Sequence, residues 1–92
     1  MDDAILQSSA LPGIIDAVAR HAAGVAPHEC CGLVAEIDGR YAYLPCENVA
    51  RPDPETRFMI APEAWIEAEE RGRVVMICHS HVGKPPLRVS RL

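Results

Sequence analysis

The sequence is poor in aromatic residues and has no long hydrophobic run. Phe, Trp and Tyr make up 4% of its 92 residues, whereas hydrophobic residues as a class make up 49%. A core formed by this chain must therefore consist mainly of Ala, Val, Ile and Leu side chains. No apolar run approaches the roughly 18 residues that a membrane-spanning helix needs, and the acidic start Met1-Asp2-Asp3 does not resemble a secretory signal. We therefore expect a small cytoplasmic protein that does not enter a membrane.

An excess of positive charge is also missing. Lys and Arg number 9 against 13 Asp and Glu, which gives a net charge of −4, and this balance argues against binding to nucleic acid or to an anionic membrane surface. The four cysteines contain no C-x-x-C pair, so a structural zinc site made from them would lack the usual spacing. We interpret Cys30, Cys31, Cys46 and Cys78 as buried, reduced thiols.

Hydrophobic periodicity predicts one α/β domain in which helices flank a mixed sheet. The first helix is expected over residues 11–23, capped by Ser8 or Ser9 and stopped by Gly24. A second helix is expected over 62–71, opened by a proline and closed by Gly72. The predicted apolar faces comprise Leu11, Ile14, Ile15, Val18 and Ala22 in the first helix and Trp65, Ile66 and Ala68 in the second.

Three segments are predicted to be strands, namely 31–37, 40–44 and 73–78, and the last contains the apolar, β-branched run Val74-Val75-Met76-Ile77. Asp38-Gly39 between the first two is a strong signal for a two-residue hairpin turn. Residues 47–55 are polar and contain two prolines, which predicts an irregular loop, and a short additional strand is predicted over 57–60.

The pattern changes after residue 81. Residues 82–92 have no periodicity, and Pro85-Pro86 disfavours a central strand because proline has no backbone N–H. We therefore predict a domain over residues 1–81 followed by an irregular tail over 82–92.

The end of the third predicted strand carries two histidines. Because side chains i and i+2 of a strand point to the same face, His79 and His81 would present two imidazoles side by side. Imidazole is a common zinc ligand, and a catalytic zinc typically has three protein ligands and an open position for water. A zinc hydrolase also needs a base beside that water, usually a carboxylate. Glu29, at the start of the first predicted strand, is the candidate if the first and third strands are neighbours.

The order of these residues resembles that of the JAMM (MPN-plus) zinc metalloprotease family, over residues from about 10 to 81. The matching motifs are His28-Glu29-Cys30-Cys31-Gly32-Leu33 and, after two strands, a loop and a helix, His79-Ser80-His81. The segment between them is similar to prokaryotic members, above all to the amino-terminal domain of phage tail-assembly proteins. The resemblance implies a cytidine-deaminase-like α/β domain. It also implies that Glu29 is the general base, that His79 and His81 are zinc ligands, and that Ser80 is the small catalytic-site residue between them.

The sequence departs from the family motif after the second histidine. The motif continues with a serine eight residues on, which stabilises the tetrahedral intermediate, and with an aspartate eleven residues on, which is the third zinc ligand. Those positions hold Val89 and Leu92 here, and no Asp or Glu follows Glu70. The family acts on peptide or isopeptide-linked protein substrates. We expect this chain to be a truncated JAMM domain that binds Zn²⁺ weakly or not at all and is inactive as a peptidase.

The alternative is a non-catalytic MPN-like assembly or interaction module, as in phage tail assembly. In that case Glu29 could itself ligate zinc together with the two histidines, and it would then not be free to act as a base. A thiol hydrolase that pairs Cys30 or Cys31 with a histidine lacks an apparent third residue to orient that pair. His28 is a candidate substitute zinc ligand. An open sheet edge and uncovered apolar surface also predict self-association, as a homodimer.

Overall fold

The computed structural model describes residues 4–80 and 87–91, and these form two α-helices, a short 3-10 helix and four strands. In chain order the elements are η1 (Ala4–Gln7), α1 (Leu11–Val25), β1 (Cys31–Ile37), β2 (Arg40–Cys46), α2 (Pro62–Arg71), β3 (Arg73–Ser80) and β4 (Leu87–Arg91). Neither α-helix in this described part combines the length and the apolar character needed to cross a bilayer. His81, which we predicted to lie beside His79, is outside the described residues, as are residues 82–86.

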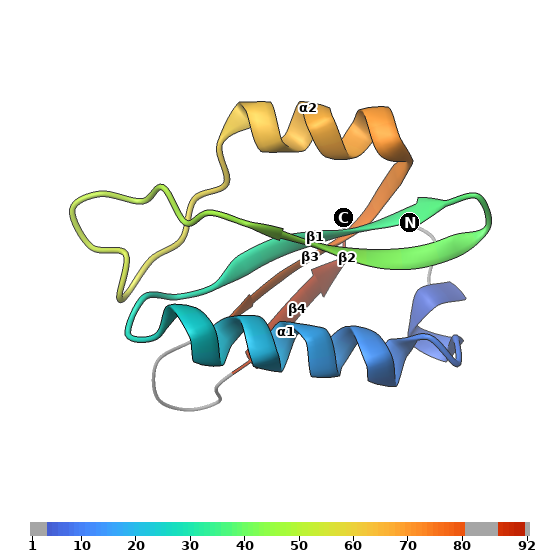
Figure 1. The fold of residues 1–92 in the computed structure, drawn as a ribbon, viewed down its shortest axis with the longest axis horizontal. Helices are drawn as coiled ribbons and strands as arrows, with labels where there is room; N and C mark the ends of the chain where they lie inside the picture. The colour runs from blue at the N-terminus through green and yellow to red at the C-terminus, as the bar shows by residue number, and fades with distance from the viewer. Residues whose placement is uncertain (1–3, 81–86, 92) are drawn as a thin grey trace.

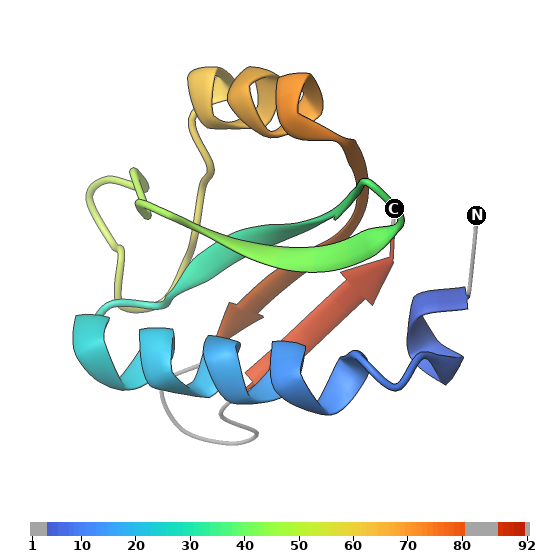
Figure 2. The ribbon, with the colours of Figure 1, turned by 45° about the vertical axis from the view of Figure 1, so that its right-hand side comes forward.

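The strands form one sheet in the order β2-β1-β3-β4, with helices on both faces. Helix α1 runs along one face and α2 along the other, as Figures 1 and 2 show from two directions. The predicted α/β fold with flanking helices is therefore confirmed. Each pairing between neighbouring strands is antiparallel, so this sheet is antiparallel rather than mixed.

The hairpin between β1 and β2 forms at the predicted turn. Asp38 has a φ of 52° and Gly39 a φ of 79°, which are the left-handed values that a two-residue type I′ turn requires. The pairing then runs in register from Ile37 opposite Arg40 to Cys31 opposite Cys46. Strand β2 thus continues two residues beyond its predicted end at residue 44.

Two hydrophobic clusters lie on the two faces of the sheet. On the α1 face, Ile14 and Val18 pack against the buried side chains of Val34 and Met76. On the α2 face the buried members are Cys31, Leu33, Ile60 and Ala68, with Phe58, Trp65 and Ile77 packed against them. Strand β1 is buried from Cys31 to Ala35 and contributes to both clusters, which is the pattern of a central strand covered on both faces.

The helix boundaries agree with the prediction in most details. Helix α2 covers the predicted residues, and Gly72 caps its end. Helix α1 continues past Gly24 to Val25, and its N-cap is Ala10, whose backbone N–H donates to the Ser8 hydroxyl at 3.0 Å. Ile15 and Ile66, which we placed on the apolar faces, are 42% and 57% exposed. Neither residue belongs to the hydrophobic clusters of the sheet faces.

Two predictions about short segments are wrong. Residues 57–60 do not form a strand, because this segment bonds to the side chain of Asn48 and to the backbone of Val49 instead of joining the sheet ladder. In addition, η1 was not predicted, although its Ile5 is 1% exposed and belongs to the α1-face cluster. Four residues are too few to show a helical period.

The prediction of an irregular tail over 82–92 is also wrong for residues 87–91. Leu87–Arg91 forms β4, which pairs with β3 from Ser80 opposite Leu87 to Met76 opposite Arg91. The two prolines that argued against a strand precede β4 in the sequence and are not part of it. Strand β4 itself contains no proline, and it lies at the outer position of the sheet beside β3.

The start of β1 depends on a residue without a side chain. A Cβ atom built on Gly32 would overlap the aromatic ring of Tyr43, which lies over this position. We expect Gly32→Ala to lower the free energy of unfolding by about 1–3 kcal/mol, because the ring must move out of a packed site. Urea denaturation monitored by tryptophan fluorescence measures this change.

Gly13 provides a matched control for this substitution. It lies in α1, and a Cβ built there meets no atom within 4 Å. Gly13→Ala should therefore stabilise the protein, by up to about 1 kcal/mol, through helix propensity. If the two substitutions had the same effect, Tyr43 would not be packed over Gly32.

Candidate functional site

The end of β3 and the start of β1 meet at one end of the sheet. Cys31 lies opposite His79 in the antiparallel register. One residue further, the backbone N–H of Ser80 donates to the carbonyl oxygen of Cys30 at 3.1 Å, and the backbone N–H of Cys30 donates to the Ser80 hydroxyl at 2.8 Å. This reciprocal pair extends the ladder by one residue. It confirms that the first and third predicted strands are neighbours, which was the condition for bringing Glu29 near the histidine segment.

Ser80 holds this junction together. Its side chain is 4% exposed, and its hydroxyl accepts the Cys30 N–H described above. That contact joins the end of β3, which carries His79, to the start of β1, which follows Glu29. The contact is a positioning one, and a catalytic part for Ser80 stays a prediction.

His79 projects from the other face of β3. Neighbouring residues of a strand point to opposite faces of the sheet. His79 therefore lies on the α2 face, and Ser80 lies on the α1 face. The imidazole of His79 stacks on the ring of Phe58, with centroids 4.4 Å apart and planes 20° from parallel. The loop before α2 therefore fixes the plane of this imidazole, a contact that the sequence pattern did not reveal.

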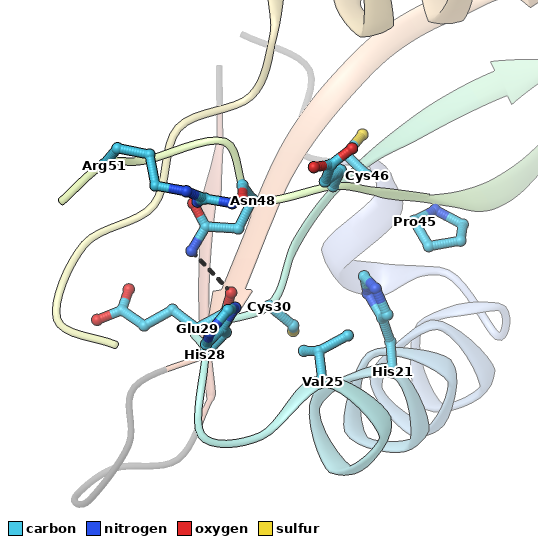
Figure 3. A pocket seen from close by; sticks show the side chains of 10 residues that line it. His21, Val25, His28, Glu29, Cys30, Pro45, Cys46, Asn48 and Arg51 are labelled. Atoms are coloured by element: carbon cyan, nitrogen blue, oxygen red, sulfur yellow. Dashed lines mark hydrogen bonds between the residues drawn. The ribbon is translucent and has the colours of Figure 1, made fainter. Parts of the chain in front are cut away.

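Glu29 is buried and its backbone is held on both sides. The residue is 3% exposed. Its backbone N–H donates to the carbonyl oxygen of Pro54 at 2.8 Å, and its own carbonyl oxygen accepts the Asn48 side-chain amide at 3.0 Å. Figure 3 shows this second bond as a dashed line. The position of Glu29 is therefore set by the loop after β2 as well as by β1.

Asn48 organises that loop. Its Nδ2 group donates toward the carbonyl oxygens of Glu29, Pro54 and Arg57 at 2.9 to 3.1 Å. Its Oδ1 atom accepts the backbone N–H groups of Ala50 and Met59 at 3.0 and 3.1 Å. The residue is 9% exposed. We did not predict Asn48 as a site residue, because an asparagine in a polar, proline-containing segment has the appearance of an ordinary loop residue.

A cleft of about 500 Å³ opens beside Glu29. It lies between the last turns of α1, the end of β2 and the following loop (Figure 3). Its lining residues are His21, Val25, His28, Glu29, Cys30, Pro45, Cys46, Glu47, Asn48 and Arg51. The lining thus carries two carboxylates, two imidazoles and one guanidinium, and the guanidinium of Arg51 also donates to the carbonyl oxygen of Ala50 at 2.6 Å.

His21 is held in one orientation inside this cleft. Its Nδ1 atom lies 2.7 Å from the hydroxyl of Tyr43. Burial raises the pKa of Tyr43 and lowers the pKa of His21, so both groups are neutral near pH 7. The two neutral groups share one hydrogen bond, in which the phenol donates to Nδ1 in one tautomer of His21 and Nδ1–H donates to the phenol oxygen in the other.

Comparison with known proteins identifies the family of this chain. The family model of prokaryotic homologues of the JAB domain matches residues 12–91. The chain belongs to the prokaryotic JAB family. This assignment confirms the JAMM resemblance drawn from the two motifs, and the match includes β4.

One curated relative of this JAB domain is the tail tip assembly protein K of Escherichia phage N15. The two are 45% identical over 67 residues, which are 73% of this chain and 27% of the relative. The chain therefore spans about a quarter of the length of that relative. No solved structure gives a significant match.

Members of the JAB family often bind zinc, and we asked whether the donors of this JAB domain suit it. Within residues 4–80 and 87–91, no three His, Cys, Asp or Glu side chains lie close enough together to hold a metal ion. His79 is the one predicted metal ligand in the described part, since His81 lies outside it. Val89, at the motif position of the serine, is paired with Cys78 in the sheet. The described donors thus do not fit a catalytic zinc site, which needs three protein ligands.

The environment of the buried cysteines of the JAB domain does not favour a catalytic thiolate nucleophile. All four are free, and Cys30, Cys31 and Cys78 are buried as predicted, whereas Cys46 is half-buried. Burial raises the pKa of Cys31 and of Cys78 to about 12. Because the thiolate is the reactive form, this environment argues against a thiol hydrolase.

The structure predicts that Asn48 is essential to the site. Asn48→Ala would remove the side-chain partner of two buried backbone groups, the Glu29 carbonyl oxygen and the Ala50 N–H, and of three part-buried ones. Each such group costs about 1–3 kcal/mol, so we expect a loss of at least about 2 kcal/mol in the free energy of unfolding. Chemical denaturation measures this loss.

Thr56→Ala is the control within the same loop. The hydroxyl of Thr56 makes one exposed contact of 3.5 Å to the carbonyl oxygen of Asp53. Its removal should change stability by less than about 0.5 kcal/mol. Equal effects of the two substitutions would show that Asn48 does not organise the loop.

Proposed function

We propose that this chain is a non-catalytic JAB module that acts by binding, in the assembly of a phage tail tip. The similarity to tail tip assembly protein K of phage N15, at 45% identity over 73% of this chain, supports the setting. The relative is a larger protein, of which this chain matches 27%, so the activity and partners of the whole relative are part of the proposal.

The observation that carries the proposal is the donor set at the end of β3. His79 contributes an imidazole, and its ring is stacked on Phe58. The motif positions for the serine and the third ligand hold Val89 and Leu92, and the sequence after Glu70 has no carboxylate side chain. Those residues cannot supply the oxygen ligand that the family motif provides. We therefore derive no catalytic step through zinc.

The cleft beside Glu29 is the surface that a binding module would use. Its floor is fixed, because the Asn48 amide holds both Glu29 and the loop that forms the opposite wall. A preorganised cleft binds with little loss of conformational entropy. Pairing of two copies through an outer strand, β2 or β4, is also part of this proposal, since these strands lie at the two edges of the sheet.

A zinc-dependent peptidase or isopeptidase is the second candidate function. The observation in its favour is that Glu29 lies two residues before Cys31, the register partner of His79. The predicted base and one predicted ligand are thus at the same end of neighbouring strands. This arrangement is shared by an active enzyme and by a descendant that has lost activity.

Metal content and hydrolysis distinguish the two functions. We expect the purified chain, dialysed against a weak chelator, to retain far less than one zinc per molecule by elemental analysis. His79→Ala should contain the same small amount, because the imidazole is not part of a complete site. Neither protein should cleave an isopeptide-linked substrate.

A different outcome would favour the peptidase. One zinc per molecule in the unaltered chain, lost on His79→Ala, would show that a complete ligand set exists. Hydrolysis that is abolished by Glu29→Gln but not by Glu47→Gln would then establish the peptidase. Glu47 is the suitable control, because it is an exposed carboxylate that lines the same cleft.

A further inference from the structure

Two of the four cysteines are direct partners across neighbouring strands. Cys31, the first residue of β1, lies opposite Cys46, the last residue of β2. Both side chains lie with the cluster on the α2 face of the sheet. We propose that Cys31 and Cys46 are a disulfide-forming pair, closed by a small disulfide oxidant, at the mouth of the cleft that Glu29 lines.

The strand geometry permits this bond. Opposite residues of an antiparallel pair have Cα atoms roughly 4.5 to 5.5 Å apart, and disulfides form over Cα separations of roughly 4.4 to 6.8 Å. The Sγ atom of Cys31 lies 3.8 Å from the carbonyl oxygen of Cys46, so the buried thiol is directed toward its partner residue. The Sγ atom of Cys46 contacts the carbonyl oxygen of Leu44 at 3.5 Å, so closing the bond requires the Cys46 side chain to turn from Leu44 toward Cys31.

The other two cysteines provide an internal comparison. Cys30 and Cys78 belong to the cluster on the α1 face, and they are 1% and 0% exposed. They are not register partners, because Cys78 lies opposite Gly32. Cys30 is instead bonded through its backbone to Ser80. This pair is both closed to reagents and placed diagonally, so it should stay reduced.

Cys46 is the side chain that a reagent reaches first. It is the half-buried member of the four, and it borders the cleft. With glutathione disulfide as the oxidant, the Cys46 thiolate attacks one sulfur atom and releases one glutathione thiolate. The Cys31 sulfur then attacks Sγ of Cys46 and releases the second glutathione. Two protein thiols lose two protons and two electrons, and one glutathione disulfide becomes two glutathione molecules.

The bond would act on the site through the loop that begins at Glu47. Cys31 lies two residues after Glu29, and Cys46 lies two residues before Asn48. A link between them would tie the start of β1 to the point where the loop leaves β2. The cleft wall that Asn48 organises would then be anchored covalently as well as by hydrogen bonds.

The test is oxidation of the folded full chain with glutathione disulfide, followed by alkylation and mass spectrometry. We expect a mass decrease of about 2 Da, for two hydrogen atoms, and a fall in alkylatable thiols from the four of the sequence to two. Trypsin should then release one linked pair of peptides, one ending at Arg40 and one ending at Arg57, because trypsin does not cleave between Arg51 and Pro52. Cys30→Ser should keep this link, which assigns it to Cys31 rather than to its neighbour, and Cys78→Ser should keep it too.

Cys46→Ser should abolish the link, and Cys46→Ala should abolish it too. Circular dichroism shows whether each variant is folded. Three results would overturn the proposal. One is a link that persists without Cys46, the second is a link that uses Cys30 or Cys78, and the third is a glutathione adduct on Cys46 that never closes onto Cys31.

Discussion

The side-chain amide of Asn48 is the interaction on which the candidate site depends. It joins Glu29, Pro54 and Arg57 through its Nδ2 group, and Ala50 and Met59 through its Oδ1 atom. Four of these residues lie in the loop between β2 and α2 and Glu29 lies just before β1, so all five are outside the strands and helices. A buried polar backbone group without a partner is costly, and one amide here contacts five backbone groups, with its two N–H hydrogens shared among three carbonyl oxygens. The loop is therefore fixed although it contains neither a strand nor a helix.

Two sets of hydrogen bonds position the candidate site at the end of the sheet. The Ser80 and Cys30 pair locks the end of β3 to the start of β1, and Asn48 locks the same start to the loop after β2. Glu29 lies where the two constraints meet, and Phe58 from the far side of that loop supports the His79 ring. The JAB framework thus surrounds a strand end at which the motif position of the serine holds Val89. A framework of this kind can serve recognition without chemistry, which is the basis of the proposed function.

The sequence predicted the parts of the fold that follow from local pattern. Asp38-Gly39 specified its hairpin, because few other residues accept positive φ at both positions, and the apolar period specified α1 and α2. The prediction missed β4, since Pro85-Pro86 was allowed to outweigh the strand-forming residues that follow it. It also missed the role of Asn48 and the stacking of Phe58 on His79. Both depend on contacts between segments that are separated in the sequence, which a local pattern does not predict. The closeness of Glu29 to the histidine strand was conditional on a strand pairing that only the structure could supply.

Hydrogen exchange of individual amides tests the central claim most directly. If Asn48 organises the loop, the N–H groups of Ala50 and Met59 will be protected in the unaltered chain, despite lying outside the sheet and helices. Asn48→Ala will remove this protection, whereas the amides of Leu33 and Met76 within the sheet will keep theirs as long as the domain stays folded. Rapid exchange of Ala50 and Met59 in the unaltered chain, or protection that survives the substitution, would contradict the account.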